Sequence, residues 1–202
     1  MASMADRLVL ASVSSARARL LRDAGVAFTI DPADLDEGRI KAEQHARGAT
    51  ALSCAAELAR AKARAVAKRN HDALVIGADQ ILALDDAWFD KPPDHAAARE
   101  QLVQLRGRTH RLATAVCICR NGEPVWQASS EPRLTMRRFS DRFLDDYVAS
   151  EGEAILGSVG AYCLEGRGVQ LFAAVEGDHF AIQGLPLVAL LTWLREAGAL
   201  PE

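Results

Sequence analysis

The segment 50–84 constrains the fold more than any other part of this chain. Apolar residues recur at helical spacing across 50–69, at Leu52, Ala55, Ala56, Ala59, Ala63 and Val66. This pattern predicts an amphipathic helix with one face in the core. The run Leu74-Val75-Ile76 follows, passes through Gly77-Ala78-Asp79-Gln80 and continues from Ile81 to Leu84. A helix followed by a buried strand indicates an α/β protein.

The rest of the chain continues this alternation of strand-like and helix-like segments. We expect strands at 7–11, 26–30, 110–119, 124–129 and 133–139, and helices that begin at Ser14, Asp94, Ser140 and Pro186. Asn121-Gly122 predicts a hairpin turn, and Gly25, Gly107 and Gly198 are expected helix stops. The polar stretch 31–48 is interpreted mainly as loop. No repeat or linker interrupts residues 1–202, so we expect a single domain.

Charge and apolar content narrow the classes of function. The formal net charge is -3, and no run of five like charges occurs, which argues against a nucleic-acid track because such tracks need many cations. No segment approaches the ~20 apolar residues of a membrane span, and the N-terminal apolar run is too short for a signal peptide. We therefore expect a cytoplasmic protein with no membrane and no nucleic-acid partner.

The four cysteines do not suggest a metal site. Cys54, Cys117, Cys119 and Cys163 form no C-x-x-C pair. We expect reduced thiols, with Cys117 and Cys119 on one strand face in the core, and leave disulfides as the alternative.

The turn after the first strand is a candidate anion site. Ser12, Ser14 and Arg17 stand at the predicted start of a helix, where free backbone N–H groups attract anions. The alternative is that the serines only cap the helix. The turn contains neither a P-loop nor a dinucleotide fingerprint, so any phosphate site here is of another kind.

Asp79 is the leading candidate for catalysis or metal binding. It follows an apolar strand and a glycine, where α/β sheets place ligand groups at the carboxyl ends of strands. An ordinary turn aspartate is the alternative. Asp36 and Glu37 in the polar stretch are the best candidate partners, because Mg²⁺ prefers hard oxygen ligands.

Two lysines are candidates for binding a polyphosphate. Lys62 interrupts the alanine-rich face of its helix, and Lys91 precedes two prolines that fix its backbone. Cations on rigid elements suit phosphate groups. For Lys62, a side chain that reaches solvent along the helix surface is the alternative.

Other polar features are interpreted as structural. The segment Arg106-Gly107-Arg108-Thr109-His110 is taken as a helix stop, with a phosphate-contacting turn as the alternative, and Asp145-Asp146 as a solvated helix face. Asp178-His179 lacks a nucleophile-elbow serine and is not taken as part of a triad.

Taken together, these segments resemble the Maf family of nucleoside triphosphate pyrophosphatases, also called septum-formation proteins. The resemblance extends from Leu8 to about Gly198 and rests on the order and spacing of short motifs. These are Leu10-Ala11-Ser12-Val13-Ser14 with Arg17, Glu57-Leu58-Ala59 with Lys62-Ala63, Ile76-Gly77-Ala78-Asp79-Gln80, Lys91-Pro92, Leu105-Arg106-Gly107-Arg108-Thr109-His110, Gly157-Ser158-Val159-Gly160-Ala161-Tyr162 and Gly184-Leu185-Pro186-Leu187.

The resemblance implies an elongated, mixed central sheet flanked by helices, with a cleft between two lobes. It also implies a cytoplasmic enzyme that uses a divalent cation, Mg²⁺ or Mn²⁺, releases pyrophosphate from a nucleoside triphosphate and commonly forms a homodimer. Asp79 matches the family's catalytic acid, the proton acceptor for water. The residues matching its phosphate- and metal-handling set are Ser12, Arg17, Glu37, Lys62 and Lys91.

The resemblance also points to three positions that select the base. Ser15 and Ala16 stand where the family usually has proline and arginine, which leaves the substrate open. Gln80 and Glu165 are similar to the subgroup acting on 7-methyl-GTP, and a carboxylate suits a cationic methylated guanine. The alternatives are a dTTP/UTP pyrophosphatase and a nucleotide-binding regulator of cell division with little turnover.

Overall fold

The computed structural model describes residues 7–201, in which eight strands form one mixed sheet. The strand order is β2-β1-β3-β5-β7-β8, and β4 and β6 pair with β3 and β5. The strands are β1 Leu8–Leu10, β2 Thr29–Ile30, β3 Leu74–Leu84, β4 Ala87–Phe89, β5 Thr109–Arg120, β6 Glu123–Ser130, β7 Arg133–Met136 and β8 Phe172–Glu176. β1 runs parallel to β2 and β3, and the other pairings are antiparallel. The predicted α/β class and mixed sheet are confirmed.

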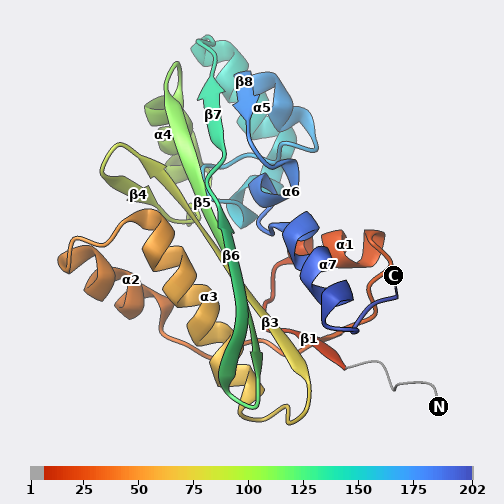
Figure 1. Ribbon diagram of the computed structural model, residues 1–202. Coiled ribbons are helices and arrows are strands. Elements are labelled where there is room, and N and C mark those ends of the chain that lie inside the picture. Colours follow the sequence, from red (N-terminus) through yellow and green to blue (C-terminus); the bar gives the residue numbers. More distant parts are fainter. Residues whose placement is uncertain (1–6, 202) are drawn as a thin grey trace.

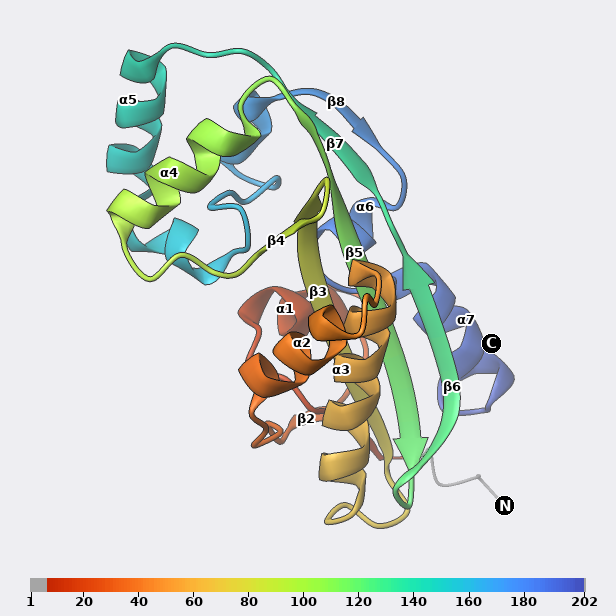
Figure 2. The ribbon, with the colours of Figure 1, turned by 90° about the vertical axis from the view of Figure 1, so that its left-hand side faces the viewer.

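Helices flank this sheet and divide the molecule into two ends joined by the long strands β3 and β5 (Figures 1 and 2). The helices are α1 Ser15–Asp23, α2 Glu37–Ala46, α3 Ala51–Ala67, α4 His95–Leu105, α5 Asp141–Glu151, α6 His179–Ile182 and α7 Leu187–Glu196, with 3₁₀ turns η1 Gly152–Gly157 and η2 Arg167–Leu171. α4 and α5 lie at one end, and α1, α2 and α3 at the other. Within residues 7–201, no helix is long and apolar enough to cross a membrane.

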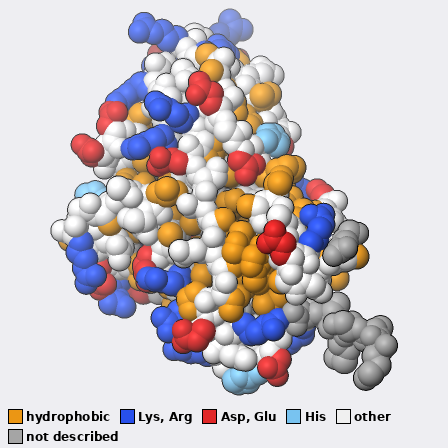
Figure 3. Space-filling model, in the orientation of Figure 1, with side chains coloured by type: hydrophobic (Ala, Val, Ile, Leu, Met, Phe, Trp, Pro, Cys, Tyr) orange, Lys and Arg blue, Asp and Glu red, His pale blue; other side chains and the backbone are white. Residues whose placement is uncertain are grey.

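Three apolar layers hold the elements together. α3 packs its alanine face on one side of the sheet, where Cys54, Cys117 and Cys119 are buried free thiols. α1 and α7 cover the other side, and α4 and α5 close the second end of the molecule. Figure 3 shows hydrophobic side chains on the face where β6 passes beside α7, and Trp126 and Trp193 stack there with ring centroids 5.7 Å apart. The expected reduced thiols are confirmed, and so is the core position of these three cysteines, whereas Cys163 is also a free thiol but is only half-buried.

The segment 31–48 was expected to be mainly loop, and this prediction is wrong. Residues 37–46 form α2, whose first turn is capped by the Asp36 carboxylate accepting from Arg39 N at 2.9 Å. None of its residues is buried. An apolar stripe is the main sequence signal of a helix. α2 lacks that stripe, so only its cap identifies it.

Other expected bounds shift by a few residues. The strand predicted at 26–30 is only Thr29–Ile30, and the one predicted at 133–139 ends at Met136. The helices predicted to begin at Ser14, Asp94 and Ser140 do use these residues as N-caps. Pro186 stands at the N-cap position just before α7.

Candidate active site

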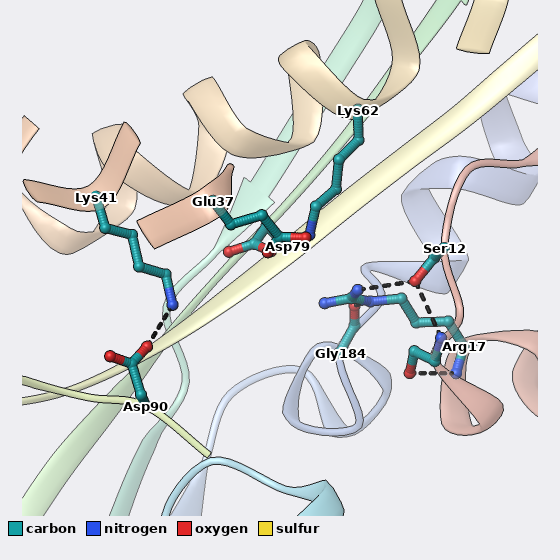
Figure 4. Close-up of polar contacts among 9 residues, drawn as sticks. Ser12, Arg17, Glu37, Lys41, Lys62, Asp79, Asp90 and Gly184 are labelled. Carbon is teal, nitrogen blue, oxygen red and sulfur yellow. Dashed lines mark hydrogen bonds and ion pairs between the residues drawn. The ribbon is translucent and has the colours of Figure 1, made fainter. Parts of the chain in front are cut away.

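A buried ion pair joins the middle of β3 to the middle of α3. Lys62 Nζ lies 2.6 Å from Asp79 Oδ1 (Figure 4), and both side chains are more than nine-tenths buried. The approach is possible because β3 has no side chain at Gly77, where a Cβ would come within 2.2 Å of Ala59 O on α3. The two alternatives left open are thereby excluded. Asp79 lies within a strand and not in a turn, and Lys62 points inward and not to solvent.

Glu37 brings a second carboxylate to the same lysine. Its Oε2 lies 2.9 Å from Lys62 Nζ, and its side chain is 42% exposed. Glu37 is the first residue of α2, and Lys41, one turn later on the same helix, forms an ion pair of 2.6 Å with Asp90. Burial lowers the pKa of Lys41, but its hydrogen bond to Asp90 and the nearby carboxylates outweigh this, so the net pKa is raised. Two ion pairs, Glu37–Lys62 and Lys41–Asp90, therefore hold α2 at the site.

The turn between β1 and α1 places a guanidinium opposite these carboxylates. Arg17 Nη1 donates to Ser12 Oγ at 3.2 Å, and Arg17 Nε donates to Gly184 O at 2.8 Å. Ser14 caps α1 by accepting from Arg17 N at 3.4 Å. Burial lowers the pKa of Arg17, while Asp79 and Glu37 act in the opposite sense. The serines thus do cap and order the turn, and they hold a buried cation as well.

Lys91 adds a further cation, on the segment after β4. Partial burial lowers the pKa of Lys91, and the neighbouring charges of Arg17 and Lys62 lower it further. Lys91 therefore shares one electrostatic environment with these two residues. An anion placed among three such cations would relieve their mutual repulsion.

At the other end of the site, Gln80 and Glu165 are held by hydrogen bonds. Gln80 Nε2 donates to Thr114 Oγ1 at 2.9 Å, and to the backbone oxygens of Ala181 and Ile182 at 2.8 and 3.1 Å. Glu165 forms an ion pair with Arg19 of α1. Both side chains are thus fixed by partners from distant parts of the chain.

All of these groups line one cleft with a volume of about 1110 Å³. The cleft brings together all but one of the residues singled out for a functional role from the sequence, namely Ser12, Ser14, Ala16, Arg17, Glu37, Lys62, Asp79, Gln80, Lys91 and Glu165. Asp36 is not among its lining residues, because its carboxylate caps α2.

The donor set of the cleft fits a divalent cation that also binds phosphate. Asp79 Oδ2 is buried and has no hydrogen-bond partner, so a carboxylate oxygen beside Glu37 is left for a ligand. Within residues 7–201, no group of three or more His, Cys, Asp or Glu side chains is arranged to hold a metal. Mg²⁺ commonly uses one or two carboxylates together with phosphate oxygens and water, so two carboxylates are a suitable number.

Comparison with known proteins identifies the family. The profile of the family described as "Maf-like protein" matches residues 7–197. The chain belongs to the Maf family. It is 50% identical over 200 residues to a "Nucleoside triphosphate pyrophosphatase" of Rhodospirillum rubrum, and this match covers 99% of each chain. It is 53% identical over 192 residues to a protein of the same name from Paramagnetospirillum magneticum, which covers 95% of this chain and 99% of that one.

A third Maf relative carries a more specific name. A "7-methyl-GTP pyrophosphatase" of Rhizobium meliloti is 46% identical over 197 residues, which is 98% of this chain and 99% of that one. The resemblance inferred from the motifs is therefore confirmed at the level of the family. Relatives of both names match along the whole length.

Four residues that form ion pairs or hydrogen bonds within this Maf cleft were missed by reasoning from sequence. Lys41, Asp90, Arg19 and Gln183 all line it. Lys41 stands four residues after Glu37, a spacing that places both on one helix face. This signal was lost because the segment was interpreted as loop. No local pattern marks the other three residues, since each takes its place through contacts with distant segments.

Proposed function

We propose that this chain hydrolyses a nucleoside triphosphate to the nucleoside monophosphate and pyrophosphate. Water attacks the α-phosphorus, the α–β phosphoanhydride bond breaks, and the water's proton passes to the enzyme. The observation that carries this proposal is Asp79, whose Oδ1 is held by Lys62 and whose Oδ2 is buried without a partner. The names of the relatives support the same reaction.

Asp79 is the proposed proton acceptor. A base must be within hydrogen-bond reach of the water it activates and must be fixed in direction. Lys62 orients the carboxylate through Oδ1 at 2.6 Å, which leaves the second oxygen for the water's proton. Asp79 and Glu37 are also the residues that would hold a divalent cation, Mg²⁺ or Mn²⁺, which when bound polarises phosphate oxygens as a Lewis acid.

The cations of the cleft are the proposed binding set for the triphosphate. Arg17, Lys62 and Lys91 neutralise the negative charge that moves onto the leaving pyrophosphate, a role in which preorganised cations are most effective. Ser12 holds Arg17 in place, and Ser14 orders the turn through its cap. Free N–H groups at the start of α1 add donors on the same side.

We propose that the nucleobase of the substrate is bound between Ala16, Gln80 and Glu165. Glu165 supports 7-methyl-GTP as a candidate substrate, because a carboxylate attracts the positive charge of the methylated guanine. The name of the Rhizobium meliloti relative supports this candidate too.

The test is pyrophosphate release from a panel of nucleoside triphosphates with Mg²⁺ or Mn²⁺. Asp79→Asn keeps the shape of the side chain and removes the base, so we expect a loss of about 10²- to 10⁴-fold in kcat. Asp86→Asn, in the exposed turn after β3, is the matched control and should leave the rate unchanged. In ¹⁸O-labelled water, the label should enter the monophosphate.

Each part of the proposal has a contrary outcome. Tight binding without any release would favour a nucleotide-binding regulator over an enzyme. Label in the pyrophosphate would move the attack to the β-phosphorus. Normal activity of Asp79→Asn would remove that residue from the role of base.

A further inference from the structure

Arg19 is the partner of Glu165 at the end of the cleft where the nucleobase is proposed to bind, called the base end below. The two side chains form an ion pair across 146 residues of sequence. The same Arg19 nitrogen, Nη2, also donates to Gln183 Oε1 at 3.2 Å. Arg19 therefore ties α1 to two loops that were brought there by the fold, and it does so inside the cleft lining.

Arg19 also stands one helical turn after Ala16. Residues three apart on a helix are neighbours on its surface, and Ala16 has no functional group to present. Both residues line the cleft. The Arg19 guanidinium is therefore the polar group next to Ala16 on this face of α1, while Arg22, one turn further on, is stacked over Phe28.

The orientation of Gln80 completes the set of hydrogen-bonding groups. The backbone oxygens of Ala181 and Ile182 can only accept, so the Gln80 amide must turn its NH₂ group toward them. Its carbonyl oxygen then remains for a ligand. The base end of the cleft thus offers an acceptor from Gln80, an acceptor from Glu165 and a donor from Arg19.

We propose that Arg19 is a specificity-determining residue that neutralises Glu165. The proposal rests on the function proposed above. A carboxylate without a counter-ion would favour a cationic base such as 7-methylguanine. A carboxylate paired with a guanidinium instead presents a neutral donor and acceptor side by side, which matches a neutral base with an N–H next to a carbonyl oxygen. The ion pair therefore weakens, without abolishing, the preference for a cationic base that Glu165 gives to the cleft, and it allows neutral bases to bind as well.

The size of the effect follows from the exposure of the pair. The side chains of Arg19 and Glu165 are 47% and 31% exposed, and water screens such pairs, so their interaction is modest. Removal of the Arg19 charge should change the relative affinity for the two bases by about two- to fivefold.

The experiment measures binding, so that it does not depend on turnover. Dissociation constants are determined by calorimetry for the α,β-methylene analogues of GTP and 7-methyl-GTP with Mg²⁺, which bind without being cleaved. In Arg19→Gln, the ratio of affinities should shift toward the methylated nucleotide by about two- to fivefold. In the double variant Arg19→Gln with Glu165→Gln, the shift should disappear.

Arg22→Gln is the matched control. Arg22 lies on the same helix, lines the same cleft and stacks its guanidinium over Phe28 at 5.7 Å. The change removes the same charge from the same rim, so a shift as large as in Arg19→Gln would reduce the effect to general electrostatics and overturn the proposal. An unchanged ratio in Arg19→Gln would overturn it as well.

The outcomes separate this inference from the proposed function. Binding of the analogues with the expected shift, together with no pyrophosphate release from the true nucleotides, would overturn the function and leave the role of Arg19 standing. Pyrophosphate release with an unchanged ratio of affinities in Arg19→Gln would overturn the role of Arg19 and leave the proposed function standing. Binding of neither analogue would overturn both.

Discussion

Lys62 and Asp79 meet across the interface between α3 and the sheet, with Nζ and Oδ1 2.6 Å apart. The layer around them is otherwise apolar and lies between the alanine face of the helix and the strand. Burying a charge without a partner is costly, so each of the two groups stabilises the buried charge of the other. The pair opens to the cleft on the side of Glu37, which makes it both a structural contact and the centre of the candidate site.

The close approach of α3 to β3 should depend on Gly77. A Cβ at this position would come within 2.6 Å of the backbone nitrogen of Ala63 as well as meeting Ala59 O. We expect Gly77→Ala to lower the free energy of unfolding in urea by about 1–3 kcal/mol or more. Gly157→Ala is the control, because nothing lies within 4 Å of its Cβ. Equal stability of the two variants would contradict this account of the packing.

Glu37 should control the affinity for the divalent cation. Loss of one of two carboxylates is expected to raise the metal concentration for half-maximal activity by on the order of ten- to a hundredfold in Glu37→Gln. Glu43→Gln, on the same helix and paired with Arg39 at the surface, should not change it. Metal titrations of pyrophosphate release measure both. A pure loss of kcat at unchanged metal dependence would argue against Glu37 as a ligand.

Loss of the Lys91 proton should weaken the binding of the triphosphate at alkaline pH. Its pKa is lowered by burial and by Arg17 and Lys62, so Lys91 loses its proton at a lower pH than an ordinary lysine. As the pH rises through this range, KM is expected to rise. Lys91→Arg keeps its charge at these pH values and should flatten that rise. Lys68→Arg, at the exposed end of α3, is the control, and its KM should depend on pH as in the wild type. If the KM of Lys91→Arg also rose with pH as in the wild type, the prediction would be refuted.

His110 should make the stability of the fold depend on pH. The ring is buried, its Nε2 lies 2.7 Å from Tyr162 Oη, and burial lowers the pKa of His110 to about 4. The unfolded chain therefore binds more protons than the folded one between about pH 6.5 and pH 4. The contribution of the neutral His110 ring to the free energy of unfolding is therefore full above pH 6.5, and it is lost as the pH falls from 6.5 to about 4.

The measurement is urea unfolding at pH 7 and pH 4.5. A drop in pKa from 6.5 to about 4 corresponds to on the order of 3 kcal/mol, and most of it should be lost at pH 4.5. His110→Gln should lose less stability between the two values than the wild type. His71→Gln, in an exposed turn, should behave as the wild type. The same pH dependence in all three proteins would show that other groups cause it.

Local patterns were enough for the elements that bury an apolar face. The spacing of alanine, leucine and valine in 50–69 predicted α3, and the apolar run Leu74-Val75-Ile76 with its extension at 81–84 predicted β3. The caps at Ser14, Asp94 and Ser140 were also predicted. These features are visible in sequence because helix periodicity, strand burial and capping each depend on residues close along the chain.

The motifs also indicated the family and the residues of the cleft. They gave only some of the elements on which these residues lie. Lys62 lies within α3, as expected, but Asp79 was expected at the carboxyl end of a strand and lies within β3. α2, which carries Glu37, was not expected as a helix at all.

Only the tertiary structure decided which charges meet. Lys62 reaches Asp79 because a glycine lets a helix approach a strand, and Arg19 reaches Glu165 because the sheet brings α1 beside a loop 146 residues away in sequence. Such contacts depend on the packing distance and register of whole elements, which local periodicity does not encode. By itself, the sequence determined the elements with an apolar face and the chemistry available to the cleft. The fold determined which side chains are paired within it and which oxygen of Asp79 is left free.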